Sequence, residues 1–121
     1  MLYSKYMLAF RNRFHGHGSL KYVYTHGKAI RSRLVTLKYT THPKRKDQRI
    51  AVVVSKKVVK GAVGRNRIRR RIYEVVRHEL LGIQPSKDLV LIVFSAELLT
   101  ITHEELVGTI QQLFKDAGVY R

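Results

Sequence analysis

The stretch GAVGRNRIRRRIYEVVR, residues 61–77, has six arginines among its seventeen residues, and only Glu74 opposes their charge. The same stretch has apolar residues three and four positions apart, which is the spacing of an amphipathic helix. Like charges at that spacing destabilise an isolated helix by roughly 0.2–0.5 kcal/mol per pair. We therefore expect a partner outside the chain to compensate this charge.

A helical wheel at about 100° per residue separates the two kinds of side chain. The apolar side holds Ile68, Ile72, Val75, Val76 and Leu80. The opposite side holds Asn66, Arg67, Arg70, Glu74 and Arg77, with Arg69 and Arg71 on its margins. This pattern predicts a helix over residues 62–81, C-capped by Gly82, that packs on a sheet and presents its arginines outward.

The other segments complete a single α+β domain over residues 1–121, in which we expect residues 1–12 to be flexible. A short helix is predicted over 19–27 and a half-buried strand over 33–40, which starts as early as Lys28 if the chain breaks near Ser32. The apolar runs 50–54 and 88–95 predict interior strands covered on both faces. Thr102 and Glu105 form a capping box before a final amphipathic helix. The result is an α-β sandwich of order α-β-β-β-α-β-α, with a four-stranded sheet and three helices.

The composition excludes several classes of protein. The chain has no cysteine, which rules out disulfides, thiolate metal sites and a cysteine nucleophile. Its apolar runs are too short to span a bilayer, and 45% hydrophobic residues suit a globular core. The N-terminus has no compact apolar stretch of the signal-peptide type. We expect a cytoplasmic protein without a membrane partner.

Positive charge is in excess and unevenly distributed. The chain has 24 Lys and Arg against 8 Asp and Glu, a formal net charge of +16. Residues 44–77 contain thirteen basic and two acidic residues, whereas residues 78–121 contain three basic and six acidic ones. Such a concentration favours a polyanion, with nucleic acid ahead of an anionic membrane. Because the helix presents almost only arginine, apart from Asn66, backbone readout of RNA is favoured over base readout of DNA.

The segment SKKVVKGAVGRNRIRRRIYEVVR, residues 55–77, resembles the protein subunit of bacterial ribonuclease P. That family has a strand ending in Ser/Ala-Lys-Lys, a later Ala, and Arg-Asn-Arg-Ile/Val-Lys/Arg-Arg at the start of a long helix. Here these positions are Ser55-Lys56-Lys57, Ala62 and residues 65–70. The resemblance covers nearly the whole chain, including YVYTHGKAIRSR (22–33) and DLVLIVFS (88–95).

The resemblance implies a left-handed β-α-β crossover, although such crossovers are right-handed in about 98% of cases. It also implies a ribonucleoprotein endoribonuclease that removes the 5′ leader of precursor tRNA. In that family the RNA subunit performs the hydrolysis with bound Mg²⁺. The protein would bind ribonuclease P catalytic RNA and precursor tRNA, and it would require no protein partner.

Carried over residue by residue, the resemblance assigns two groups of contacts, and Lys60 joins the first because it lies beside the same helix terminus. The RNA-binding positions are Lys56, Lys57, Lys60, Arg65, Asn66, Arg67, Arg69 and Arg70. The leader-binding cleft, between the sheet and the first helix, is formed by Leu20, Tyr24, Thr36 and Lys38. Strand alternation places Thr36 and Lys38 on an open polar face. Leu20 and Lys38 stand where the family commonly has aromatic rings, so Tyr24 is either the main stacking residue or an aromatic at the edge of the core.

Other candidate sites lack ligands or catalytic groups. His15 and His17 could face one metal ion, but no third ligand accompanies them. The basic region contains only Asp47 and Glu74, too few carboxylates for metal-dependent hydrolysis of a phosphodiester. We therefore predict no catalytic or metal-binding residue in the chain. A ribosomal or other structural RNA-binding protein and a basic DNA-binding module remain as alternatives.

Overall fold

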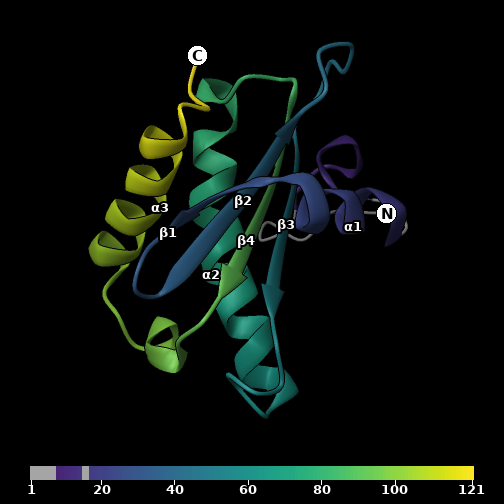
Figure 1. The fold of residues 1–121 in the computed structure, drawn as a ribbon. Coiled ribbons are helices and arrows are strands. Elements are labelled where there is room, and N and C mark those ends of the chain that lie inside the picture. The colour runs from purple at the N-terminus through teal and green to yellow at the C-terminus, as the bar shows by residue number, and fades with distance from the viewer. Residues whose placement is uncertain (1–7, 15–16) are drawn as a thin grey trace.

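A four-stranded mixed sheet in the order β1-β2-β4-β3 forms the centre of the computed structural model, which describes residues 8–14 and 17–121 (Figure 1). The strands are β1 (Lys28–Arg31), β2 (Val35–Thr41), β3 (Arg49–Val54) and β4 (Lys87–Val93). β1 and β4 run antiparallel to β2, whereas β3 runs parallel to β4. The helices are α1 (His17–His26), α2 (Ala62–Glu79) and α3 (His103–Ala117), with short 3₁₀ helices η1 (Phe10–Asn12), η2 (Leu80–Gly82) and η3 (Ala96–Leu99). The predicted class and order of elements are confirmed.

Strand alternation gives the sheet two different faces. Leu37 and Leu91 belong to the buried core that α2 and α3 close, whereas Lys38 points the other way and donates a hydrogen bond to α1. α3 begins where the capping box predicts, because the Thr102 side chain accepts a hydrogen bond from the backbone N–H of Glu105 at 3.1 Å. The sheet therefore has α2 and α3 on one face and α1 on the other.

The crossover from β3 through α2 to β4 has the left-handed sense that the family resemblance implies. In Figure 1 both strands run down the page, α2 returns upward behind them, and β4 lies to the left of β3. The general preference for right-handed crossovers would have predicted the opposite sense. β3 ends at the bottom of the view in Figure 1, and the short connection that follows it places the start of α2 there. The start of α2 therefore lies close to the lower ends of β3 and its neighbour β4.

Two details of the predicted fold are wrong. The run 50–54 does not form an interior strand, since β3 lies at the edge of the sheet and alternate residues of it are only partly covered. Gly82 does not cap α2, which ends at Glu79 with Leu80 as its C-cap, because the chain tightens into η2 before Ile83 enters the core.

The N-terminal part of the described chain is packed rather than loose. Leu8 is 2% exposed, and the Asn12 side-chain amide donates a hydrogen bond to the backbone carbonyl of Gln48 at 2.8 Å. Residues 8–12, which we expected to be flexible, are thus held against β3 and its preceding loop. Residues 1–7 lie outside the described part of the chain.

A buried carboxylate connects the loop before β3 to the sheet. Asp88 at the start of β4 is 0% exposed and accepts hydrogen bonds from Arg45 Nη1 at 2.9 Å and from Arg49 Nε and Nη2 at 3.0 and 2.7 Å. His42 Nε2 lies 3.0 Å from the same carboxylate. Arg49 also donates to the Ser19 hydroxyl at 3.2 Å, so the network extends to α1.

We predict that Asp88→Ala lowers the free energy of unfolding by about 3 kcal/mol, because two arginines lose their counter-ion at a buried position. Urea denaturation measures the change. Glu97→Ala is the matched control, since it removes an exposed ion pair with Arg33 (2.9 Å) and exposed pairs contribute little. Equal small effects in both variants would show that the Asp88 network does not stabilise the fold.

Candidate nucleic-acid interface

The apolar side of α2 is anchored as the wheel predicts. Ile68, Ile72 and Val76 are fully buried and Val75 is 3% exposed, all within the main core. Because this side faces the sheet, the residues half a turn away must face solvent. Asn66, Arg67 and Arg70 are indeed exposed.

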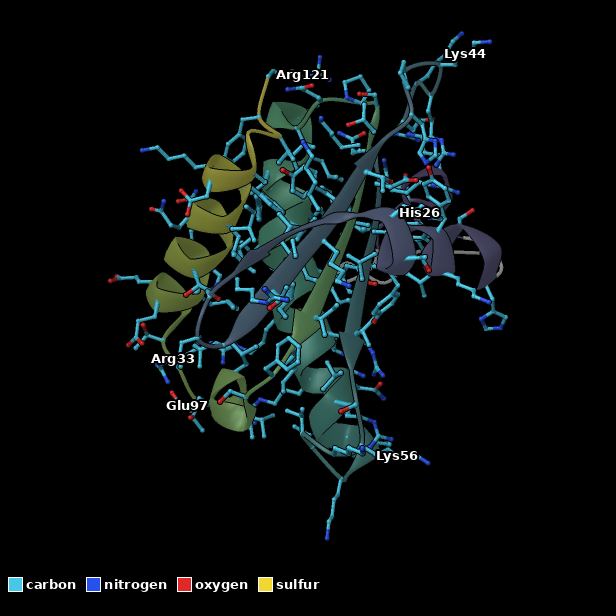
Figure 2. All side chains as sticks on the ribbon, in the orientation of Figure 1. His26, Arg33, Lys44, Lys56, Glu97 and Arg121 are labelled. Carbon is cyan, nitrogen blue, oxygen red and sulfur yellow. The ribbon has the colours of Figure 1, made fainter. Side chains whose placement is uncertain are left out.

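Lysines and arginines gather where β3 ends and α2 begins, at the lower end of the molecule in Figure 2, where Lys56 is labelled. This basic surface, defined as Lys56, Lys57, Lys60, Arg65, Asn66, Arg67, Arg69 and Arg70, contains the whole predicted RNA-binding set. Lys56, Lys57 and Lys60 are exposed, and Arg65 and Arg69 are half-buried. The first helical turns add the positive end of the helix dipole to these charges.

Two arginines of the basic surface are oriented by the chain itself. Arg65 Nη1 donates to the backbone carbonyls of Val59 and Lys60 at 3.0 and 2.5 Å. Arg69 Nη1 donates to the Asn66 side-chain carbonyl at 2.8 Å. None of these three hydrogen bonds neutralises a guanidinium charge, because carbonyl oxygens carry no net charge. These contacts therefore orient the charges while leaving them available to an anion.

Arg71 turns inward instead of lying on the margin of the outward face. Its Nη1 and Nη2 atoms donate to the backbone carbonyls of Leu98 and Ile101 at 2.7 and 2.5 Å. Leu98 belongs to η3, and Ile101 belongs to the segment that connects η3 to α3. Arg71 thus ties α2 to the start of α3, a role that the sequence pattern did not predict.

Glu74 is the acidic residue of this face, and its carboxylate pairs with residues of the next helical turn. Arg77 Nη2 donates to Glu74 Oε1 at 2.7 Å, and His78 Nε2 lies 3.3 Å from the same oxygen. The hydrogen bond from Arg77 is the main cause that lowers the pKa of Glu74 below its ordinary value. Glu74 therefore offsets Arg77 near the far end of α2 and leaves the first turns of the helix uncompensated.

A hollow of about 280 Å³ lies between α2 and the start of α3. It is lined by Arg67, Arg70, Arg71, Glu74 and His103. His103 had no place in the sequence predictions, because no spacing pattern links it to arginines more than thirty residues earlier. The geometry makes His103 a neighbour of the basic surface.

Two of the predicted leader-binding residues, Tyr24 and Lys38, are in contact. Lys38 Nζ donates to the Tyr24 backbone carbonyl at 3.0 Å and lies 5.5 Å from the centre of the Tyr24 ring. Tyr24 and Leu20 are half-buried and share one side of α1, since they are four residues apart. Burial raises the pKa of the Tyr24 phenol above its ordinary value. Both interpretations of Tyr24 remain open, because the half-buried ring packs on the fold and still reaches solvent.

Thr36 contradicts the predicted open face. It is only 4% exposed, although it lies on the same side of β2 as Lys38. Alternation gave the correct side of the strand, but it could not show that this side is covered at Thr36, because covering depends on segments distant in the sequence. Of the four predicted leader-binding residues, only Leu20, Tyr24 and Lys38 are therefore partly accessible.

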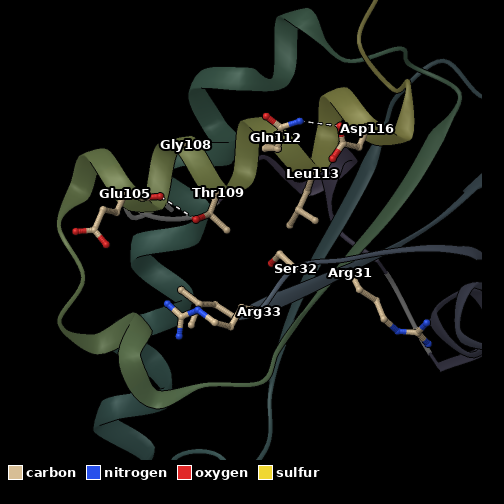
Figure 3. A pocket seen from close by; sticks show the side chains of 10 residues that line it. Arg31, Ser32, Arg33, Glu105, Gly108, Thr109, Gln112, Leu113 and Asp116 are labelled. Carbon is tan, nitrogen blue, oxygen red and sulfur yellow. Dashed lines mark hydrogen bonds between the residues drawn. The ribbon is translucent and has the colours of Figure 1, made fainter.

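A larger hollow lies elsewhere. It measures about 550 Å³ between α3 and the turn from β1 to β2, and Figure 3 shows its lining. Arg31, Arg33, Glu105 and Asp116 all line it, so both signs of charge are present, although the Arg31 side chain extends away from Asp116 in Figure 3. None of the predicted RNA-binding or leader-binding residues lines this hollow. A large cavity and the concentrated positive charge therefore occur at different places in this protein.

Within residues 8–14 and 17–121, no three His, Asp or Glu side chains come together as a metal site. His15 of the histidine pair considered above lies outside those ranges. No helix in the same ranges has the length and apolar character needed to cross a bilayer.

Comparison with known sequences identifies relatives along almost the whole chain. Residues 8–118 match the family described as Ribonuclease P. The ribonuclease P protein component of Synechocystis sp. is 32% identical over 97 residues, which cover 80% of this chain and 77% of the relative. That of Bacillus velezensis is 30% identical over 111 residues, covering 92% of this chain and 93% of the relative.

Solved structures show the same fold. The RNase P protein of Staphylococcus aureus superimposes with a TM-score of 0.79 at 23% identity, covering 91% of this chain and 98% of that chain. The protein from Thermotoga maritima gives a TM-score of 0.76 at 20% identity, covering 86% and 96%. At these identities the likeness supports the architecture alone. Together with the family match over residues 8–118, the sequence relatives show that this chain belongs to the ribonuclease P protein family, the protein component of a ribonucleoprotein endoribonuclease of tRNA processing.

Proposed function

We propose that this chain binds the catalytic RNA of ribonuclease P and the 5′ leader of precursor tRNA, and so assists removal of the leader. The observation that carries the proposal is the basic surface at the start of α2. Arg67 and Arg70 are exposed there beside Lys56, Lys57 and Lys60. The arginines of residues 61–71 form no ion pair with a carboxylate within the described chain. Their positive charge is therefore available to an anion from outside the chain.

A phosphate backbone is the anion that suits this surface. The planar guanidinium group binds two phosphate oxygens at once, and arginine stays charged at every physiological pH. Each phosphate contact releases a condensed counter-ion, so binding of this kind weakens steeply with salt. Arg67 and Arg70 would bind catalytic RNA directly, while Arg65 and Arg69 approach it in orientations set by their own hydrogen bonds.

The leader would bind beside α1, at Tyr24 and Lys38. Tyr24 offers the ring on which a base can stack, and Lys38 offers the charge for an adjacent phosphate. Leu20 supplies apolar surface but no ring, so the stacking energy is smaller than with an aromatic residue there. Thr36 is too buried to contribute a large contact surface. Charge therefore supplies a larger share of the leader affinity.

Hydrolysis belongs to the RNA subunit in this proposal. Within residues 8–14 and 17–121 the carboxylates do not gather into a metal site, Asp88 accepts hydrogen bonds from two arginines, and Glu74 Oε1 is occupied by Arg77 and His78. Catalytic Mg²⁺ would be held mainly by RNA phosphates. Positive charge on the protein would reduce repulsion between the two RNAs and thereby lower the Mg²⁺ concentration that they need.

We predict that Arg67→Ala and Arg70→Ala each weaken binding to a bacterial ribonuclease P catalytic RNA and reduce the salt slope by about one. Filter binding at several salt concentrations measures both quantities. Arg33→Ala is the matched control, because Arg33 is equally exposed but pairs with Glu97 away from the basic surface. All three variants should keep their thermal unfolding midpoint. An unchanged slope for Arg67→Ala and Arg70→Ala would place those side chains outside the interface.

We also predict that the protein accelerates leader removal by the catalytic RNA at low Mg²⁺ and raises affinity for precursor tRNA above that for mature tRNA. Tyr24→Ala should weaken precursor binding by about tenfold and leave mature tRNA unaffected, because only the precursor offers a base to stack. Tyr24→Phe, which keeps the ring, is its control. Equal affinity for both tRNAs would favour a structural RNA-binding protein, and efficient competition by duplex DNA would favour a DNA-binding module.

A further inference from the structure

A second group of aromatic rings lies on the side of α1 that faces away from Tyr24. The Tyr22 ring stacks on His26 with a centroid separation of 4.4 Å and an interplanar angle of 24°. His42, just beyond the end of β2, lies 5.8 Å from the Tyr22 ring at 46°. We call Tyr22, His26 and His42 the ring cluster. Two residues along a helix correspond to a rotation of about 200°, so Tyr22 and Tyr24 lie on opposite sides of α1.

The ring cluster is accessible. Tyr22 is 46% exposed, which is high for a large aromatic side chain, and the His42 side chain is 35% exposed. His26 is also exposed and lies at the end of α1 that leads into β1 (Figure 2). Because the Tyr22 ring is only partly covered, it retains surface on which another planar group can stack.

A hollow of about 380 Å³ lies beside the ring cluster, where α1, β1 and β2 meet the start of β4. Its lining includes Tyr22, His26, Tyr39, Lys28 and Lys87, but no carboxylate. Lys28 is exposed, and Lys87 Nζ is held toward the hollow's rim by a 2.9 Å hydrogen bond to the Thr41 hydroxyl. The hollow therefore combines ring faces with uncompensated positive charge.

Asp88, which follows Lys87 in sequence, does not cancel that charge. Asp88 is fully buried and already accepts hydrogen bonds from Arg45 and Arg49, with His42 at 3.0 Å. The network instead fixes His42, and through it one wall of the ring cluster. Rings with lysines around them are the features that single-stranded nucleic acid requires, because bases stack on the rings and phosphates pair with the cations.

We propose that the ring cluster and the adjacent hollow bind a single-stranded segment of RNA, with a base stacked against Tyr22 and phosphates paired with Lys28 and Lys87. The site rests on the proposed RNA-binding function but is separate from the basic surface of α2 and from Tyr24 and Lys38. Figure 2 places His26 and Lys44 toward one end of the molecule and Lys56 at the other, so the two RNA contacts lie far apart. The strand belongs either to the catalytic RNA or to the precursor tRNA.

The first test measures affinity. Tyr22→Ala is expected to weaken binding of one of the two RNAs by about tenfold, whereas Tyr22→Phe keeps the ring and binds as the unchanged protein does. Thr25→Ala, also exposed on α1, is the control for changes in the helix itself. Separate titrations with bacterial catalytic RNA alone, and with precursor and mature tRNA in the presence of that RNA, identify which strand uses the site.

The second test measures proximity and uses the absence of cysteine from the chain. Tyr22→Cys introduces a unique thiol, to which an azidophenacyl group is attached for photo-cross-linking to the assembled RNAs. Gly108→Cys on α3 is the control, because a side chain there meets open space on the acidic half of the protein. We expect a cross-link to a single-stranded segment from position 22 and none from position 108.

The outcomes separate this inference from the proposed function. Unchanged affinity of Tyr22→Ala for every RNA, together with no cross-link above that of Gly108→Cys, overturns the ring-cluster site. If Arg67→Ala still weakens RNA binding in that case, the proposed function stands without it. A cross-link confined to double-stranded RNA would also contradict the proposal, since paired bases cannot stack on the ring.

Discussion

Burial of the apolar side of α2 is the constraint on which the rest of the structure depends. Ile68, Ile72, Val75 and Val76 are buried in the core behind the sheet. Fully burying a side chain of this size contributes about 1.5–3 kcal/mol, far more than repulsion between neighbouring arginines costs. The helix can therefore carry a dense positive charge without unfolding. The same anchoring fixes its rotation, so Arg67 and Arg70 face solvent.

Arginines in the same helix have different roles because their neighbours differ. Arg71 is used inside the protein, where two backbone carbonyls before α3 accept its hydrogen bonds. Arg77 is neutralised by Glu74. Only toward the start of α2, next to the lysines that follow β3, does the charge remain uncompensated. A stretch that is basic along most of its length in sequence thus presents uncompensated charge at only one end of the helix.

The opposite end of the sheet is organised by a single buried acid. Asp88 holds Arg45 and Arg49 and approaches His42, which fixes the loop between β2 and β3 and one wall of the ring cluster. The buried carboxylate offsets one of the two guanidinium charges that touch it, and no carboxylate lines the hollow beside Lys28 and Lys87. Both ends of the protein therefore present positive charge, but with different partners for it: mainly arginine at α2, and rings with lysine at α1.

The sequence by itself determined the elements and the composition of the basic surface. Periodicity found α2 and its buried stripe, the capping box found the start of α3, and the motif around Arg65–Arg70 led to the family, because each of these signals lies within a few consecutive turns or residues. The left-handed crossover was expected only from the family resemblance, and tertiary structure alone decided the edge position of β3, the burial of Thr36 and the inward turn of Arg71. It also brought His42 to Tyr22 and His103 to Arg67. These features depend on which distant segments pack together, and contacts between residues far apart in the chain leave no periodic trace in one sequence.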